Sequence, residues 1–394
     1  MPTIIFTEED CGRENLYPFT LTRSIPDIRM GILTLREKWE KCLGMSSINL
    51  AQKKYLDTRD TIKLSPDMVA GPYLLIRANA IPSNALIKQT KKLSAGQCLI
   101  SQDGTVIALA FTNTQVLKGG KIKVAQTVQA QGEVQLLQYG WQIFQWNDAA
   151  LRADFALLTK GRKSAPIDKS NRCTNTAAIF IEPGAVVQHS VLNAESGPIY
   201  IGKNALVMEG CCIRGGLAMG EGAVLKMGAQ VYGATTLGPY CTGGGEIKNS
   251  VLFGYSNKAH HGYLGDSVIG EWCNLGAGTT NSNIKNNAGL VCYTLGDGEW
   301  VNGPGNKGGL LMGDHSKAAI NTSFNTGAVV GVCCNVFGGG LSPVHIPSFS
   351  WGMEGKVTYQ LPKAFTDIAA WKKLKGGSLS EAEKKQLKHI FDHH

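Results

Sequence analysis

The sequence lacks the features that mark several large classes of protein. No run of about 18 apolar residues occurs in its 394 residues, so no transmembrane helix is predicted. The opening residues, MPTIIFTEED, contain neither the basic nor the apolar segment of a signal peptide, which favours a cytoplasmic protein. Lysines and arginines form no long cluster that would indicate a nucleic-acid-binding arm. We therefore expect neither nucleic acid nor membrane as a partner.

The cysteines lack the spacing of a zinc site or a disulfide framework. There are 11 of them, no CxxC pair occurs, and two pairs are adjacent, Cys211-Cys212 and Cys333-Cys334. An odd number of cysteines without such spacing is typical of small buried side chains in a reducing compartment. The identity of any metal ligand stays unknown from the sequence.

The N-terminal part has strand and helix patterns but no glycine-rich phosphate loop. Strands are predicted at 2–6, from residue 73 within 73–82, and at 104–112, and helices at 32–43, with Gly44 as C-cap, and at 141–161. The alternation predicts an α/β domain, which we assign to residues 1–165. Neither GxGxxG nor GxxxxGK[ST] occurs, yet a strand, a loop with Arg23 and Arg29, and a helix form the layout of a nucleotide-phosphate site. The alternative is that both arginines make structural ion pairs.

Glycine is abundant in the second half, where a period of six residues replaces helical and strand patterns. The chain has 48 glycines, and they do not recur at every third position as in collagen. Apolar residues recur every six positions, and small residues mostly stand four positions later: Ile201, Val207, Ile213, Met219, Leu225, Val231 and Leu237. This hexapeptide pattern predicts a parallel β-helix, with the apolar residues inside and small residues at the corners.

The period is interrupted twice before it ends. It returns at Tyr263, Ile269 and Leu275, and again from Met312 to Val336. Residues 285–310 break it, which predicts a loop ejected from one face of the β-helix. We assign residues 175–345 to the β-helix and 346–394 to a C-terminal tail. In that tail Ser378 and Glu381 are predicted to form a capping box before a terminal helix.

The stretch from Glu246 to Asn283 concentrates side chains that suit one chemistry. It contains Lys248, His260, Tyr263, Asn274 and Asn283 on a glycine-rich background. A histidine can accept a proton near neutral pH, and a lysine supplies a point charge for a phosphate. Amide and phenol groups can bind the hydroxyls of a sugar.

These residues fall into motifs that resemble those of a known family. Glu246-Ile247-Lys248, Lys258-Ala259-His260-His261-Gly262-Tyr263-Leu264-Gly265-Asp266 and Asn274-Leu275-Gly276-Ala277-Gly278-Thr279 are similar to motifs in the acetyltransferase half of GlmU, the bifunctional N-acetylglucosamine-1-phosphate uridyltransferase/glucosamine-1-phosphate N-acetyltransferase. Leu225-Lys226-Met227-Gly228-Ala229 resembles the family's Leu-Arg-Pro-Gly-Ala, with lysine in place of arginine. Residues 16–39 resemble the N-terminal loop of divergent GlmU-like proteins.

The resemblance implies a role for each matching residue. His260 would be the general base on the sugar amine, and Lys226 and Lys248 would hold the sugar phosphate. Tyr263 and Asn274 would bind sugar hydroxyls or phosphate, and Ala277 and Asn283 would line the site of acetyl-CoA, the co-substrate. His261 competes for the role of base, and alternation along a strand predicts that it points away from the cleft. The family also implies a left-handed β-helix and a homotrimer.

The N-terminal domain departs from the family pattern. LxxGxGTRM and the Gly-Asp that holds magnesium are absent, and Arg77-Ala78-Asn79 stands near the second strand. Arg13, Arg23, Arg29 and Lys38 are the candidates to bind nucleotide phosphates, and Mg²⁺ is a possible cofactor. Two functions stay open. The first is a sugar-phosphate N-acetyltransferase with a sugar nucleotidyltransferase domain that forms UDP-N-acetylglucosamine, a cell wall precursor. The second is an acyltransferase acting on another amino- or hydroxy-sugar, with a non-catalytic N-terminal domain. A non-enzymatic β-helix scaffold is a third, less favoured reading.

Overall fold

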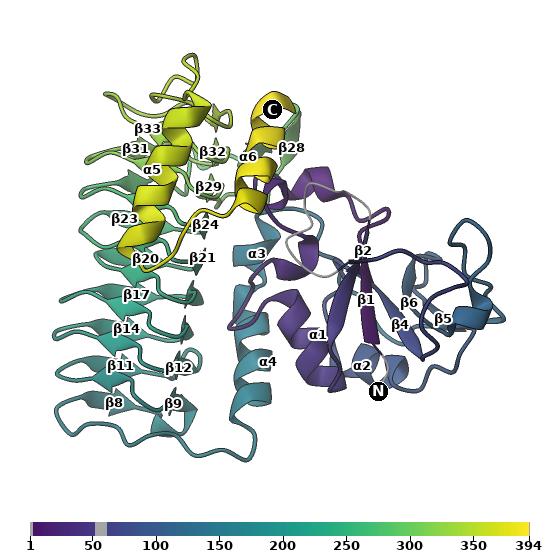
Figure 1. The fold of residues 1–394 in the computed structure, drawn as a ribbon. Coiled ribbons are helices and arrows are strands. Elements are labelled where there is room, and N and C mark those ends of the chain that lie inside the picture. The colour runs from purple at the N-terminus through teal and green to yellow at the C-terminus, as the bar shows by residue number, and fades with distance from the viewer. Residues whose placement is uncertain (1–2, 52–60, 394) are drawn as a thin grey trace. The chain divides into compact units, whose positions relative to one another are not determined.

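A computed structural model describes residues 3–51 and 61–393 of the chain (Figure 1). It divides into two compact units. The first comprises Met1–Arg13, Arg23–Ile28 and Leu33–Gln138, and the second Glu14–Thr22, Arg29–Ile32 and Tyr139–His394. This division places the helix predicted at 141–161 in the second unit, whereas the sequence predicts that this helix closes the first domain, residues 1–165. Within the described ranges, no helix is long and apolar enough to cross a membrane.

The first unit is built on a mixed sheet whose strand order is β3-β2-β1-β4-β6-β5-β7. Central β1 pairs in parallel with β2 on one side and β4 on the other, and β4 pairs antiparallel with β6. Its apolar residues, Ile4, Ile5 and Phe6, are buried, as expected for a central strand. The strands are β1 (Thr3–Thr7), β2 (Ser47–Leu50), β3 (Thr61–Ile62), β4 (Tyr73–Arg77), β5 (Gln97–Ile100), β6 (Val106–Phe111) and β7 (Gln126–Gln129).

The strands predicted at 2–6, 73–82 and 104–112 correspond to β1, β4 and β6, so the α/β prediction is confirmed; Pro2 lies outside the described residues. The helices of this unit are α1 (Leu35–Leu43) and α2 (Asn84–Thr90). Helix α1 begins with a capping box between Thr34 and Glu37 and ends at Gly44 in the left-handed conformation, as predicted.

Residues 172–346 of the second unit form a parallel β-helix whose strands stack in three ladders. The first ladder comprises β10 (Val186–Val187), β13 (Leu206–Val207), β16 (Val224–Leu225), β19 (Thr242–Gly243), β22 (Asn257–Lys258), β25 (Asn274–Leu275), β30 (Lys317–Ala318) and β33 (Asn335–Val336). The second comprises β8 (Arg172–Thr174), β11 (Val191–Asn193), β14 (Cys212–Arg214), β17 (Gln230–Tyr232), β20 (Glu246–Lys248) and β23 (Tyr263–Gly265), with β26 (Thr280–Asn281) and β31 (Ser323–Phe324) paired beyond it. The third comprises β9 (Ile179–Ile181), β12 (Ile199–Ile201), β15 (Leu217–Met219), β18 (Thr235–Leu237), β21 (Val251–Gly254), β24 (Val268–Glu271), β29 (Leu311–Met312), β32 (Val329–Val330) and β34 (His345–Ile346).

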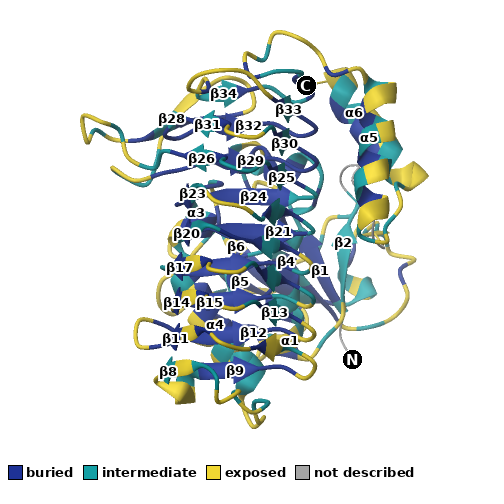
Figure 2. Ribbon diagram, turned by 90° about the vertical axis from the view of Figure 1, so that its left-hand side faces the viewer, coloured by how far each residue is buried: buried dark blue, intermediate teal, exposed yellow. Residues whose placement is uncertain are grey.

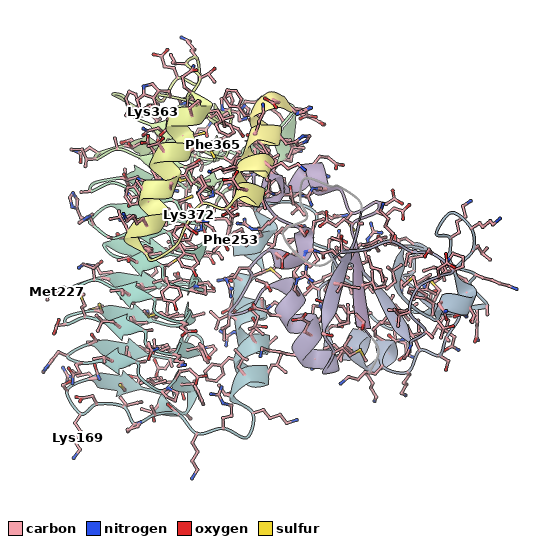
Figure 3. All side chains as sticks on the ribbon, in the orientation of Figure 1. Lys169, Met227, Phe253, Lys363, Phe365 and Lys372 are labelled. Atoms are coloured by element: carbon pink, nitrogen blue, oxygen red, sulfur yellow. The ribbon has the colours of Figure 1, made fainter. Side chains whose placement is uncertain are left out.

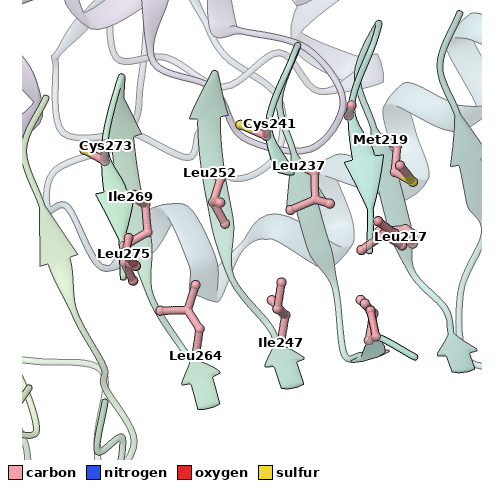
Figure 4. Packing of buried hydrophobic residues seen from close by; sticks show 14 of the residues in the cluster. Leu217, Met219, Leu237, Cys241, Ile247, Leu252, Leu264, Ile269, Cys273 and Leu275 are labelled. Carbon is pink, nitrogen blue, oxygen red and sulfur yellow. The ribbon is translucent and has the colours of Figure 1, made fainter. Parts of the chain in front are cut away.

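The hexapeptide prediction of the β-helix core is confirmed. All seven apolar residues from Ile201 to Leu237 belong to one buried cluster inside the coils, and the third-ladder strands β12 and β15 among those that carry them are dark blue in Figure 2. Figure 4 shows Met219, Leu237, Leu252 and Ile269 stacked from coil to coil in the third ladder. Each coil repeats this position because parallel strands align identical registers along the ladder.

One predicted interior residue is wrong. Leu264 is buried in the core cluster, whereas Tyr263, taken as the inward residue of its hexad, is only half-buried on the outer face. The cause is a shortened step between two ladders, because Ile269 follows the interior residue Leu264 after only five residues, and a count of six back from Ile269 gives Tyr263. Strict six-residue counting therefore loses its register between Leu237 and Ile269.

The predicted insertion at 285–310 is present as an ejected hairpin. Strands β27 (Cys292–Thr294) and β28 (Trp300–Asn302) pair antiparallel, while β24 below and β29 above remain neighbours in their ladder. Tyr293 of the hairpin is buried and stacks on Trp141 with ring centroids 5.1 Å apart. This stacking ties the insertion to the segment that leads into α3 (Gln142–Gln145) and α4 (Asn147–Thr159).

Gly31, in the N-terminal loop that resembles that of GlmU-like proteins (residues 16–39), links helix α4 to the β-helix. The amide of Gly31 donates to Asn147 Oδ1 over 2.6 Å, and Thr236 Oγ1 donates to the Gly31 carbonyl over 2.9 Å. Gly31 has φ of +77°, and a Cβ there would lie 2.6 Å from Asp154 Oδ2, so only glycine fits. Much of the motif shared with GlmU-like proteins thus has a structural role.

Two C-terminal helices, α5 (Leu361–Leu374) and α6 (Glu381–His393), pack on the upper coils of the β-helix (Figure 1). The capping box of α6 lies two residues later than predicted. Ser380 and Glu383 exchange the reciprocal bonds, instead of Ser378 and Glu381. Glu383 also pairs with Lys372 of α5, which fixes the start of α6 at this register.

Candidate active site

A cavity of about 650 Å³ opens at one corner of the β-helix, where three successive coils turn between ladders. Its lining consists of Lys226, Met227, Gly228, Gln230, Gly245, Glu246, Ala259, His260, His261, Gly262 and Tyr263. Of the predicted site residues, Lys226, His260 and Tyr263 meet here. Met227 is 69 % exposed and projects outward beside the cavity (Figure 3).

Both histidines line this cavity, so the expectation that His261 points away is wrong. Strand β22 ends at Lys258, and the following residues 260–262 form a bend, so the alternation of a strand does not apply to them. A Cβ on Gly278 of the next coil would lie 3.4 Å from His261 Nε2. The His261 ring therefore leans toward that coil.

Glycines of the neighbouring coil allow the histidine bend to approach closely. Gly245 has φ of +69°, and a Cβ on it would lie 2.6 Å from the His260 carbonyl oxygen. A Cβ on Gly244 would overlap the Ala259 carbonyl. Gly244 and Gly245 thus form the surface against which the bend packs.

Tyr263 lies across Gly265, two residues further along the same strand. A Cβ on Gly265 would lie 2.6 Å from Tyr263 Cε1 and closer still to the hydroxyl oxygen. The tyrosine ring therefore occupies the space of the side chain missing at residue 265. Burial, followed by the nearby Asp266 carboxylate, raises the pKa of Tyr263, so the hydroxyl stays protonated at neutral pH.

Asn283 connects this hydroxyl to a buried carboxylate. Its Nδ2 donates to Tyr263 Oη over 3.0 Å and to Asp266 Oδ2 over 2.6 Å. Asn249 donates to the other oxygen, Asp266 Oδ1, over 2.6 Å. Asp266 is 4 % exposed, and these amide donors satisfy a carboxylate that would otherwise be costly to bury.

The two lysines proposed for phosphate occupy different ladders. Lys226 follows β16 and reaches the cavity, whereas Lys248 ends β20 on the outer face of the second ladder. Lys248 Nζ lies 5.8 Å from the centroid of the Tyr232 ring, within the range of a cation–π contact. The Tyr232 hydroxyl donates to Glu246, and this bond raises the pKa of Tyr232 to about 12.

Asn274 and Ala277 belong to the coil above the histidine bend. Asn274 accepts a hydrogen bond from Asn257 Nδ2 over 3.2 Å, and Lys375 of the chain after α5 donates to Asn257 Oδ1. The Ala277 carbonyl accepts from the Asn321 amide over 2.7 Å, directly before Gly278. Ala277 thus stands beside the His261 ring, whereas Asn274 lies on the ladder face near the C-terminal helices.

In the first unit, β1 and β4 form the point where the strand order reverses. Ligands of open α/β sheets bind outside the carboxyl ends of strands at such a point. Glu8 follows β1 there and forms an ion pair with Arg13, whose guanidinium also donates to the Arg23 carbonyl over 2.7 Å. Arg77 ends β4 and donates to Asn79 Oδ1 over 3.1 Å.

Two further candidate cations of the predicted phosphate site are Arg29 and Lys38. Arg29 belongs to the second unit, where its Nε donates to the Phe253 carbonyl over 3.1 Å. Lys38 is buried within α1, at 4 % exposure. Arginine side chains at the β1–β4 edge suit a phosphate. Within residues 3–51 and 61–393, no group of three histidine, cysteine, aspartate or glutamate side chains could hold a metal ion, so we derive no step through Mg²⁺.

Three contributors to the site were not assigned a role from the sequence. Lys258 and Asp266 stand in the quoted motifs, but nothing in their spacing shows that one lies beneath the histidine bend and the other behind Tyr263. Gly265 stands in the same motif, but it has no side chain whose chemistry could have singled it out. Their roles depend on contacts between coils.

Comparison with known proteins gives the family of residues 3–163 and several GlmU-type relatives. Residues 3–163 match the model of the sugar nucleotidyl transferase family. A GlmU of Paracoccus denitrificans is 41 % identical over 76 residues, which is 19 % of this chain and 16 % of that protein. A GlmU of Methanocaldococcus jannaschii is 35 % identical over 89 residues, 23 % of this chain and 21 % of that protein. A bifunctional sugar-1-phosphate nucleotidylyltransferase/acetyltransferase of Sulfurisphaera tokodaii is 32 % identical over 94 residues, 24 % of this chain and 23 % of that protein.

These matches confirm the resemblance to GlmU-type proteins and the prediction of a transferase. The chain covers less than a quarter of the length of each of these three relatives.

Proposed function

We propose that the second unit transfers the acetyl group of acetyl-CoA to the amine of glucosamine-1-phosphate. The observation that carries this proposal is the convergence of Lys226, His260 and Tyr263 on one corner cavity of about 650 Å³. A cation for phosphate, a base for the amine and a hydroxyl for the sugar are the groups that this acceptor requires. The Sulfurisphaera tokodaii relative is named as a nucleotidylyltransferase/acetyltransferase, which supports the acetyl transfer.

In this reaction His260 acts as the general base. The sugar amine attacks the thioester carbonyl, its proton passes to the imidazole, and the carbon–sulfur bond breaks to release CoA. Lys226 and Lys248 hold the phosphate, and Tyr263 and Asn274 orient the sugar. Ala277 and Asn283 line the path of acetyl-CoA beside the histidine bend. Positioning of the amine against the thioester supplies much of the remaining acceleration.

The first unit is proposed to transfer a nucleotidyl group to the acetylated sugar 1-phosphate and form UDP-N-acetylglucosamine. Its match to the sugar nucleotidyl transferase family and the arginines at the β1–β4 edge support this assignment. Arg13 and Arg77 would neutralise the nucleotide phosphates there. The protein is proposed to work in the cytoplasm as a homotrimer, for which the exposed Met227 beside the cavity offers apolar contact surface.

Release of CoA in the presence of glucosamine-1-phosphate tests the acetyl transfer. His260→Ala is expected to lower kcat by about 10²–10⁴, the usual contribution of general-base catalysis, with little change in KM for acetyl-CoA. His261→Ala is the matched control and should stay within a few-fold of the wild type. If His261→Ala is the inactive variant, the base has been assigned one residue too early. Lack of CoA release with any amino-sugar phosphate would refute the function itself, and UTP-dependent release of pyrophosphate tests the first unit separately.

A further inference from the structure

Lys258 is the most unusual charged residue near the cavity, because its side chain is almost completely buried. Only 1 % of the residue is exposed, and burial lowers the pKa of its ammonium group to about 8. It ends β22, with Leu225, Gly243 and Leu275 on the neighbouring strands of the same ladder directed to the interior. A buried lysine is costly unless its donors are satisfied.

The ammonium group donates to three backbone carbonyls from two coils. Lys258 Nζ lies 3.2 Å from the Gly244 oxygen and 3.3 Å from the His261 oxygen, and it also bonds the His260 oxygen. An ammonium has three donors and no acceptor, so one acceptor is present for each N–H. Two of the three carbonyls belong to the two histidines that line the cavity.

These bonds fix residues 260–262, which belong to no strand and therefore to none of the three ladders. Residues 260–262 form a bend between β22 and β23, and their backbone closely approaches Gly245 of the coil below. The Lys258 bonds join the carbonyls of this bend to Gly244 of the same coil below. The orientation of each imidazole depends on the backbone from which it projects, so the lysine determines where both rings stand.

We propose that Lys258 is a positioning residue for the base of this site: its buried ammonium holds the carbonyls of His260 and His261 against Gly244 and so aims the imidazole at the acceptor amine. The inference deepens the proposed acetyl transfer and rests on it. Lys258 itself does not touch substrate, because it lies behind the lining formed by Ala259, His260 and His261.

The same ladder contains a matched control. Lys317 of β30 is half-buried on the outer face of the ladder, burial lowers its pKa, and its Nζ donates to the His315 carbonyl over 2.9 Å. It pairs in register with Asn274, and its Nζ lies over the Trp371 ring, away from the histidine bend. Loss of Lys317 therefore removes a lysine of the same ladder that also bonds a histidine carbonyl, while only loss of Lys258 should affect the bend.

The experiment compares Lys258→Met with Lys317→Met in the full chain. Lys258→Met should lower kcat for acetyl transfer by roughly 10- to 100-fold, the size expected for a base displaced by about 1 Å, with KM for acetyl-CoA within twofold. Lys317→Met should lose stability but keep the kcat of the wild type. Amide hydrogen exchange of residues 259–262 should accelerate in Lys258→Met and not in Lys317→Met.

Each outcome supports or overturns the inference. A kcat within twofold of the wild type in Lys258→Met, or equal exchange of residues 259–262 in both variants, overturns it. If Lys258→Met does not fold, Lys258→Gln, which keeps an N–H donor, replaces it under the same criteria. If both fail to fold while Lys317→Met folds, Lys258 is a folding residue only and the inference is wrong. If the wild type releases no CoA, the proposed function fails, whereas unchanged exchange in Lys258→Met separately overturns the positioning role.

Discussion

Adding one methyl group at Gly265 tests the placement of Tyr263, because the Tyr263 ring occupies the space above Gly265. Gly265 is buried and its φ lies outside the left-handed region, so alanine fits the backbone. Its Cβ would nevertheless lie 2.6 Å from Tyr263 Cε1, well inside contact distance. Gly265→Ala therefore must displace the tyrosine ring from its position over residue 265.

The expected cost has two parts. Overpacking of a buried position destabilises by about 1–3 kcal/mol, and loss of the Asn283–Tyr263 hydrogen bond accounts for about 0.5–1.5 kcal/mol of that total. If the hydroxyl orients the sugar, a loss of about 1.4 kcal/mol in transition-state binding lowers kcat/KM by about tenfold. Tyr263→Phe removes the hydroxyl without the clash and should reproduce the loss of activity but not the full loss of stability.

A double-mutant cycle separates the clash from other effects of the alanine. Urea unfolding is measured for the wild type, Gly265→Ala, Tyr263→Ala and the double variant. Because Tyr263→Ala empties the contested space, Gly265→Ala should cost little in that background, which gives a coupling free energy of about 1–3 kcal/mol. Equal costs in both backgrounds, together with wild-type kcat/KM in Gly265→Ala, would refute the placement of the tyrosine.

Three further predictions concern charge, acid stability and assembly. Lys248→Ala should raise KM for the sugar phosphate by an amount worth roughly 1–3 kcal/mol; an unchanged KM in a folded variant would remove Lys248 from the site. Burial lowers the pKa of His315 to about 3, so its neutral form stabilises the fold above the unfolded pKa of about 6.5, and this contribution is lost as pH falls toward 3. Between pH 7 and pH 5, urea unfolding should show about 2 kcal/mol more loss of stability in the wild type than in His315→Asn, which suits the left-handed backbone there; equal losses would contradict this. Light scattering at micromolar concentration should give three times the 42.2 kDa chain mass, and a fully active monomer would exclude a shared site.

The sequence by itself determined the repeating part of the fold. Every sixth residue from Ile201 to Leu237 had to be apolar and every corner small, because parallel coils place the same register position inside at each turn. It also determined the N-terminal strand–helix alternation and the C-terminal end of α1 at Gly44, whereas α1 begins at Leu35, three residues later than predicted. The motif residues Lys226, His260 and Tyr263 could be grouped from the sequence only through their resemblance to the motifs of the GlmU family.

Tertiary structure decided the features that depend on contacts between coils. The five-residue step from Leu264 to Ile269 put Leu264 rather than Tyr263 inside, and no count of six could show this. The bend after β22 brought His261 into the cavity beside His260, because residues outside a strand do not alternate. Lys258 joins the carbonyls of both histidines to the Gly244 carbonyl, 14 residues away in sequence, a distance that local propensity does not reach.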